Sequence, residues 1–233
     1  MDTLKVCIDQ VGRFPENVAG RLVLDRGTLW REPDDDSPEP VELEVGFLEG
    51  DPGLRREILA VASEWSRHAN VAFLPSARRV EECEIRISFG LPGSWSYVGK
   101  DRVGVTPQQP TMNFGWLTPR SSQEEIRRVV LHEFGHALGC VHEHFHPRGG
   151  VPWNKEAVYA WYWTHRRWDR KQVDEQVLYR YDRTLTVHSK FDPASIMIYP
   201  IPPEHTDGRF QVGLNLDLSA TDKAFIGKTY PRP

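Results

Sequence analysis

The sequence predicts an α+β protein in which a twisted mixed sheet and two long helices form an upper lobe, followed by a mostly irregular or helical lower lobe. Over residues 41–139 the patterns run in the order strand, helix, strand, strand, strand, helix. After Gly139, strand patterns are scarce. Apolar residues make up 39% of the 233 residues, an ordinary globular composition that supports a sizeable core.

Four strands and one long helix account for most of the upper lobe. The strands are expected at four short runs that suit a pleated surface: Val41–Leu48, Val71–Leu74, Glu84–Phe89 and Met112–Leu117. Asp51 can cap a helix that has Pro52 in its first turn. Apolar residues in this helix recur at spacings of four, three and four, which predicts one buried face: Leu54, Ile58, Val61 and Trp65.

The second long helix of the upper lobe carries a doubled start signal. Ser121 and Ser122 each stand three residues before a glutamate, which is the capping-box pattern. The apolar face of the helix is expected at Ile126, Val130, Phe134 and Leu138. Two histidines of the same helix then face the cleft between the lobes.

His132 begins an eleven-residue stretch that reads H-E-x-x-H-x-x-G-x-x-H. His132 and His136 project from the same face of a helix, so two imidazoles can hold one ion. Glu133 lies beside that ion, where its carboxylate can take a proton from water. Gly139 lets the chain turn, so that His142 supplies a third ligand. Three imidazoles and an open position are typical of a catalytic zinc site, whereas structural sites are closed.

A second motif lies downstream, where Ser195 to Pro200 reads Ser-Ile-Met-Ile-Tyr-Pro. Alone, this stretch predicts a short buried strand that ends at proline. Combined with the histidine motif, it indicates the tight methionine-containing turn called a Met-turn.

Together the two motifs resemble those of the metzincin clan of zinc endopeptidases, and within that clan the astacin-like proteases. Glu143 directly follows the third histidine, and Ser195 to Tyr199 reads S-x-M-x-Y. The chain is more specifically similar to bacterial astacin-like proteins without an evident secretion signal, over most of residues 41–233. Three stretches carry this closer resemblance: Gly93–Gly99, Thr111–Leu117 and Leu218–Lys223.

The resemblance implies a metzincin-like zincin fold with the active-site cleft between the two lobes. It implies one catalytic Zn²⁺, held by His132, His136 and His142. It also implies Glu133 as the general base of peptide hydrolysis. Residues 41–233 would then form the catalytic domain, divided near residue 139, with residues 1–40 as an N-terminal segment to which no role is assigned.

Four further residues have roles implied by the resemblance. Met197 would form the hydrophobic floor of the site, and Tyr199 would be a displaceable zinc ligand that stabilises the oxyanion. In the family, the residue at Glu143 pairs with a buried, processed N-terminus. Ile198 is a departure, because the family often has histidine there.

The expected function is a zinc-dependent endopeptidase that acts on a peptide or protein substrate. A substrate strand is expected to pair with the sheet edge near four consecutive residues: Asn113, Phe114, Gly115 and Trp116. Two alternatives stay open. One is a non-catalytic zinc-dependent peptide-binding module. The other is a latent protease effector that N-terminal processing activates, with Cys7 or Asp9 as candidates for the cause of latency.

Three helices are expected in the lower lobe, each marked by a capping residue. Asn154 would cap a helix to about Trp163, and Asp169 another to about Tyr179. Ser219 would cap a closing helix, with Asp222 three residues on.

Composition limits the partners and the compartment. The net charge of −4 argues against nucleic acid as the main partner. No apolar run approaches the ~20 residues that span a membrane, and the N-terminus lacks the apolar segment of a secretory signal. We therefore expect a protein that does not act at a membrane and is cytoplasmic or exported by a non-standard route. We also expect a monomer. The cysteines Cys7, Cys83 and Cys140 are too few for a disulfide framework.

Overall fold

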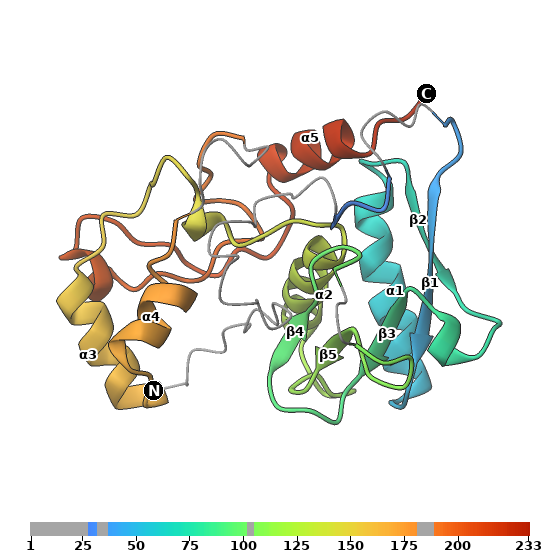
Figure 1. The fold of residues 1–233 in the computed structure, drawn as a ribbon, viewed down its shortest axis with the longest axis horizontal. Coiled ribbons are helices and arrows are strands. Elements are labelled where there is room, and N and C mark those ends of the chain that lie inside the picture. Colours follow the sequence, from blue (N-terminus) through green and yellow to red (C-terminus); the bar gives the residue numbers. More distant parts are fainter. Residues whose placement is uncertain (1–27, 32–36, 102–104, 181–188) are drawn as a thin grey trace.

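The structure is a computed structural model that describes residues 28–31, 37–101, 105–180 and 189–233. It contains a sheet with two long helices, a separate pair of shorter helices with irregular chain, and a last helix that packs on the core of the sheet (Figure 1). The strands are β1 (Val41–Phe47), β2 (Val71–Pro75), β3 (Ile85–Ser88), β4 (Ser94–Ser96) and β5 (Met112–Phe114). The helices are α1 (Pro52–Ser66), α2 (Gln123–Ala137), α3 (Lys155–Arg166), α4 (Arg170–Gln176) and α5 (Ala220–Thr229).

The five strands form one mixed sheet in the order β2-β1-β3-β5-β4. The pairs β1–β2, β1–β3 and β3–β5 are parallel, whereas β4 is antiparallel to β5. The α+β prediction with a mixed sheet is thus confirmed. Strand β4 was not expected, because three residues are too few to show an alternating pattern.

The prediction that residues 113–116 form a free edge of the sheet is wrong for Asn113 and Phe114. Asn113 and Phe114 lie in β5, which pairs with β3 on one side and β4 on the other. Asn113 is fully buried, and its amide donates to the carbonyl of Leu91 at 2.9 Å. Gly115 and Trp116 follow the end of the strand. Because β4 pairs antiparallel with the outer side of β5, the outer edge on this side of the sheet belongs to β4.

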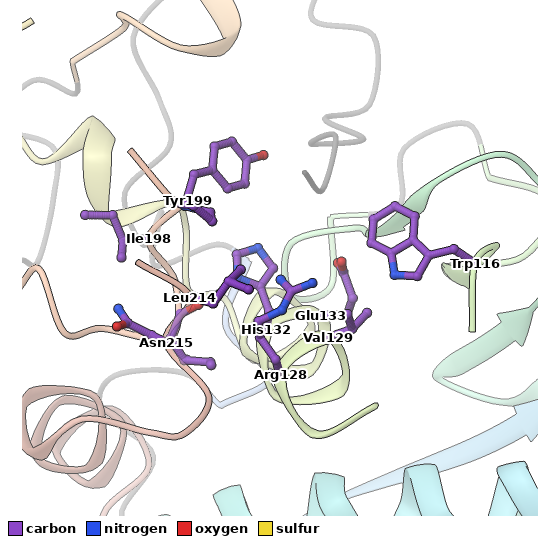
Figure 2. A pocket seen from close by; sticks show the side chains of 11 residues that line it. Trp116, Arg128, Val129, His132, Glu133, Ile198, Tyr199, Leu214 and Asn215 are labelled. Carbon is purple, nitrogen blue, oxygen red and sulfur yellow. Dashed lines mark hydrogen bonds between the residues drawn. The ribbon is translucent and has the colours of Figure 1, made fainter. Parts of the chain in front are cut away.

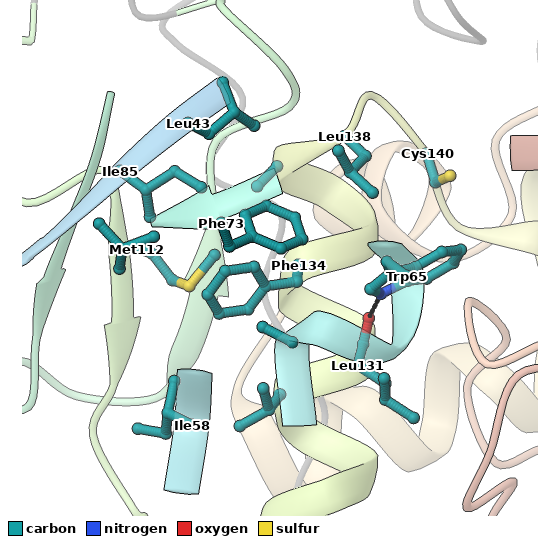
Figure 3. Packing of buried hydrophobic residues seen from close by; sticks show 14 of the residues in the cluster. Leu43, Ile58, Trp65, Phe73, Ile85, Met112, Leu131, Phe134, Leu138 and Cys140 are labelled. Carbon is teal, nitrogen blue, oxygen red and sulfur yellow. Dashed lines mark hydrogen bonds between the residues drawn. The ribbon is translucent and has the colours of Figure 1, made fainter. Parts of the chain in front are cut away.

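Helix α1 begins where its capping signal predicts. The Asp51 carboxylate accepts hydrogen bonds from the backbone N–H groups of Gly53 and Leu54, at 2.8 and 3.0 Å. The buried face matches the predicted stripe, with Val61 only partly buried and its neighbour Ala62 fully buried. At the far end, the indole of Trp65 donates to the carbonyl of Leu131 at 3.0 Å (Figure 3). This bond ties α1 to α2.

Helix α2 is capped by Ser122 alone, whose hydroxyl accepts from the N–H of Glu125 at 3.2 Å. Every residue from Val129 to Ala137 is buried, so the helix passes through the middle of the molecule. Phe134 packs edge-to-face against Phe73 of β2, with ring centroids 4.8 Å apart (Figure 3). The same core contains Leu29, which precedes the domain boundary expected at residue 41.

The three predicted caps of the lower region are confirmed. Asn154 caps α3, Asp169 caps α4 through a capping box with Gln172, and Ser219 caps α5 through a capping box with Asp222. Helix α4 ends earlier than expected, at Gln176. Among the described residues, no helix combines the length and the apolar character needed to cross a bilayer.

Candidate active site

The three histidines of the motif converge on one point. The Nε2 atoms of His132 and His142 are 3.1 Å apart, and the Nε2 atom of His136 is 3.2 Å from each of them. All three rings are buried. Among the described residues, this is the one group of histidine, cysteine and acidic side chains arranged to hold a metal ion.

This triangle fits a zinc ion. A tetrahedral ion with bonds of about 2.0–2.1 Å separates its ligand atoms by about 3.3 Å, close to the separations of the Nε2 atoms. His132, His136 and His142 therefore form the zinc-binding site.

The outer nitrogens of the two helix ligands fix their tautomers. The Nδ1 of His132 is 2.8 Å from the carbonyl of Ile196, and the Nδ1 of His136 is 2.8 Å from the carbonyl of Cys140. A carbonyl only accepts, so each Nδ1 carries the proton and leaves Nε2 free to bind metal. Burial lowers the pKa of His132 and of His142 well below the usual range, and nearby imidazoles lower it further. His132 and His142 are thus neutral, as zinc requires.

The third ligand reaches the ion because the chain reverses at the end of α2. Gly139 has φ +98°, in the left-handed region that favours glycine. The N–H of Gly139 donates to the carbonyl of His136, and the N–H of Cys140 donates to the carbonyl of Gly135, at 2.8 and 2.9 Å. These two bonds make a Schellman motif, which turns the chain toward His142. The predicted position of Gly139 is confirmed.

Three distant donors hold the last carbonyls of α2. The N–H of Gly99 donates to His136, the indole of Trp30 to Ala137, and the hydroxyl of Tyr230 to Leu138, at 2.8, 2.7 and 2.9 Å. Buried carbonyls at a helix end need such partners. The segment that contains Trp30 therefore belongs to the scaffold of the metal site, although the sequence assigned it no role.

Glu133 lies in the wall of a pocket beside His132. The pocket encloses about 380 Å³, part of it open to solvent. His132 and Glu133 rise from α2 into it, and Tyr199 lies across from Glu133 (Figure 2). Most of the remaining lining is apolar and consists of Trp116, Val129, Ile196, Ile198, Pro200 and Leu214. Arg128 and Asn215 are the polar residues that complete it. Glu133 is 1% exposed, so its carboxylate is held at the pocket and kept from bulk water.

Tyr199 packs against two of the ligands. Its ring centroid is 4.1 Å from that of His142 and 6.1 Å from that of His132. It also packs against His144, at 4.6 Å between centroids. The structure thus brings Tyr199 to the metal site, as the sequence predicts.

Met197 follows Ile196, whose carbonyl accepts from His132, and it contacts α2 at Gly135. Its role as the floor of the site stays a prediction. A Cβ placed on Gly135 would be 2.4 Å from the Met197 sulfur. A side chain there would force Met197 to move, which gives a packing reason for a glycine inside this buried helix. Sequence analysis missed the role of Gly135. Glycine destabilises a helix interior, so a glycine at such a position suggests a close contact that a larger residue would disturb.

Glu143 joins the third ligand to the Met-turn. Its N–H donates to the carbonyl of Met197 at 3.0 Å, and its carboxylate accepts from the N–H of Asp192 at 2.8 Å. Burial raises the pKa of Glu143 to about 8. The pairing of Glu143 with a chain terminus stays a prediction, because residues 1–27 lie outside the described part of the chain. Cys7 and Asp9, the candidates for latency, lie there too.

Two neighbouring histidines are buried but stand outside the triangle. Both nitrogens of His146 are engaged, Nε2 with the carbonyl of Ser189 at 3.1 Å and Nδ1 with the N–H of Arg148 at 3.2 Å. His144 stacks 5.2 Å from His142, between centroids. Cys140 is also buried, and burial raises the pKa of its thiol, so it is a packing residue as expected.

Comparisons with known proteins agree with this geometry. The family model described as Astacin, a peptidase family, matches residues 49–231. A solved structure entitled "Structure of myroilysin" is 40% identical, with a TM-score of 0.82 over 90% of this chain and 98% of that one. A second, "Crystal structure of myroilysin", is 37% identical, with a TM-score of 0.68 over 99% of this chain and 93% of that one.

A more distant solved structure shares the fold. It is high choriolytic enzyme 1, a hatching enzyme zinc-protease from Oryzias latipes (medaka fish), at 15% identity and a TM-score of 0.63, over 92% of this chain and 100% of that one. No curated protein matches the chain. The family match, the 40% identity and the three-histidine site lead to one conclusion: the chain belongs to the astacin family and is a zinc metalloprotease.

Proposed function

We propose that this zinc metalloprotease is an endopeptidase, with Glu133 as its general base and Tyr199 as its oxyanion donor. One observation carries the proposal: Glu133 and Tyr199 face the same pocket from opposite sides of the zinc ligand His132 (Figure 2). A base on one side and a phenol on the other suit the attack of water on an amide carbonyl.

The roles of the protein groups follow from where they stand. A zinc ion in the histidine triangle would make water acidic enough to lose a proton near neutral pH, and would polarise the scissile carbonyl. The Glu133 carboxylate takes the proton of the attacking water and later delivers it to the leaving amine. The Tyr199 hydroxyl donates a hydrogen bond to the oxygen that becomes negative.

The sheet supports binding in the middle of a substrate chain. Strand β4 packs beside α2, and within the described residues it pairs with a strand on one side only. An extended peptide can therefore add to β4 through main-chain hydrogen bonds, which accept many sequences. Because β-strand addition recognises the backbone and not a terminal charge, it favours internal peptide bonds. This replaces β5 as the proposed substrate strand.

A quenched fluorescent peptide with an acetylated N-terminus and an amidated C-terminus tests both parts of the proposal. We expect wild-type protein to cleave it, and a chelator to stop cleavage. Glu133→Ala should retain one zinc ion per chain, by elemental analysis, and lose cleavage. Glu124→Ala is the matched control, because Glu124 is exposed in the first turn of the same helix.

Three outcomes would count against the proposal. Full activity in Glu133→Ala would remove the assigned base. Cleavage of peptides with free ends, but none of the blocked peptide, would show an exopeptidase. Zinc and peptide binding by the wild-type protein without any turnover would favour the non-catalytic peptide-binding module.

A further inference from the structure

The Met-turn contacts the zinc ligand His132 through a single peptide group. The Nδ1–H of His132 donates to the carbonyl of Ile196 at 2.8 Å. The same peptide group carries the N–H of Met197, which donates to the hydroxyl oxygen of Ser195 at 3.0 Å. The imidazole, the peptide and the hydroxyl are therefore linked in series.

The series ends at a buried carboxylate from a distant helix. The Ser195 hydroxyl donates to Oδ1 of Asp222 at 2.6 Å. Asp222 lies in the first turn of α5, 27 residues along the chain from Ser195, and is 8% exposed. Each link in the series points its donor toward Asp222: imidazole N–H, peptide N–H, and then hydroxyl.

Donors aligned in one direction polarise one another. In a chain of hydrogen bonds, each acceptor that also donates becomes a better acceptor. A carboxylate at the end therefore strengthens the hydrogen bond that the His132 imidazole donates, which raises the basicity of its Nε2. A histidine ligand paired directly with a carboxylate gains in the same way. Here a serine hydroxyl and a peptide group carry the effect.

Other bonds fix Asp222 and the turn in place. The second carboxylate oxygen of Asp222 accepts from the N–H groups of Ile196 and Ser219, at 2.8 and 2.9 Å. The side-chain amide of Asn215 donates to the carbonyl of Ser195 at 2.8 Å. Burial raises the pKa of Asp222, and the hydrogen bonds that it accepts oppose this rise. Three donors on two oxygens suit a carboxylate, which only accepts.

We propose that Asp222 is a positioning residue for the zinc site. Through the Ser195 hydroxyl and the Ile196–Met197 peptide, Asp222 orients His132 and strengthens the bond of His132 to the metal. His136 has no such link to α5, because its Nδ1–H donates to the carbonyl of Cys140, just after the end of its own helix. The first ligand of the motif thus depends on a residue of α5, at the far end of the sequence. The proposal rests on the zinc site and on the proposed function of its ligands.

The test measures zinc affinity and the visible spectrum of the cobalt-substituted protein. Two variants break the relay at different points: Ser195→Ala removes the hydroxyl, and Asp222→Asn removes the charge while nearly keeping the shape. Ser219→Ala is the matched control. It removes the hydroxyl that accepts the N–H of Asp222 at 3.0 Å, but leaves the backbone N–H that Ser219 donates to Asp222.

We expect zinc dissociation constants, from competition with a chromophoric chelator, to rise about ten-fold or more in Ser195→Ala and Asp222→Asn. The d–d bands of the cobalt forms should shift, because the ligand field of His132 weakens. Ser219→Ala should lower the melting temperature of the metal-free protein, since it loses a helix cap. Its zinc affinity and cobalt spectrum should match those of the wild type.

Two results would overturn the proposal. The first is wild-type zinc affinity and cobalt spectra in Ser195→Ala and Asp222→Asn. The second is an equal loss of zinc affinity in Ser219→Ala, which would mean that any loosening of α5 has this effect. If Ser195→Ala does not fold, Asp222→Asn decides. Wild-type protein that binds no zinc would overturn the metal site itself, which separates that failure from a failure of the relay.

Discussion

The sulfur of Met197 lies against the backbone of Gly135. A Cβ built on Gly135 would be 2.4 Å from this sulfur and 3.1 Å from the indole of Trp65. Gly135 lies between the two helix ligands in the sequence, so the Met-turn touches the metal helix within the zinc-binding motif. A contact this close means that even a methyl group on Gly135 would displace the Met197 side chain.

Replacement of Gly135 by alanine tests this contact. Because the new methyl group collides with the Met197 sulfur, we expect the free energy of unfolding of the metal-free protein to fall by about 1–3 kcal/mol. Urea unfolding measures it. In a Met197→Ala background the same replacement should cost less, since the obstructing sulfur is gone. An equal cost in both backgrounds would show that another contact excludes the methyl group.

Replacement of Gly139 by alanine tests the chain reversal after α2. An alanine held at φ +98° should lose about 1–2 kcal/mol of stability. Zinc binding should weaken as well, because His142 depends on this turn. Gly208→Ala is the control: Gly208 has φ +71°, and a Cβ there meets no atom within 4 Å. Weakened zinc binding in both variants would mean that general destabilisation, not the turn, is responsible.

Tyr199→Phe tests the proposed oxyanion donor. Phenylalanine keeps the ring that packs 4.1 Å from His142 and removes only the hydroxyl, so the variant should still bind one zinc ion per chain through the three histidines. The turnover number should fall about 10²–10³-fold with little change in KM, because the lost hydrogen bond forms only in the transition state. Steady-state kinetics on the blocked peptide measure both. Tyr159→Phe is the control. It removes the hydroxyl by which Tyr159 of α3 donates a hydrogen bond to Asp174 of α4, and it should leave both constants unchanged.

The histidine ligands give a prediction about pH. Burial lowers the pKa of His132 and His142, so in metal-free protein both rings should stay neutral at about pH 6, where an ordinary imidazole is mostly protonated. Their contribution to stability is therefore present above about pH 6.5 and is lost as the pH falls toward the lowered pKa. Nitrogen-15 spectra of labelled histidine report the charge and the tautomer.

The same spectra in concentrated urea provide the control, because the unfolded histidines should titrate near the ordinary value. We expect the proton on Nδ1 in His132 and His136, where it donates to a carbonyl. Protonated rings for His132 and His142 at about pH 6 in folded, metal-free protein would contradict the prediction.

The sequence alone predicts the ligand set and the helix that presents it. His132, Glu133 and His136 are placed by helical spacing, and Gly139 by the conformation that glycine tolerates. The caps at Asp51, Ser122 and Ser219 are predictable for the same reason, since each acts within one turn of its own helix. These features depend on residues that are neighbours in the chain.

Contacts between distant segments appear only in the tertiary structure. Strand β4 is too short to show a pattern, so β5 was mistaken for the edge that β4 covers. Gly135 and Met197, Trp30 and Ala137, and Asp222 and Ser195 meet across large separations in sequence. Short-range sequence patterns do not reveal such pairs, because the packing and hydrogen bonds that stabilise them form only when the chain folds. Local spacing thus determined which residues bind zinc, and folding decided which distant groups hold them in place.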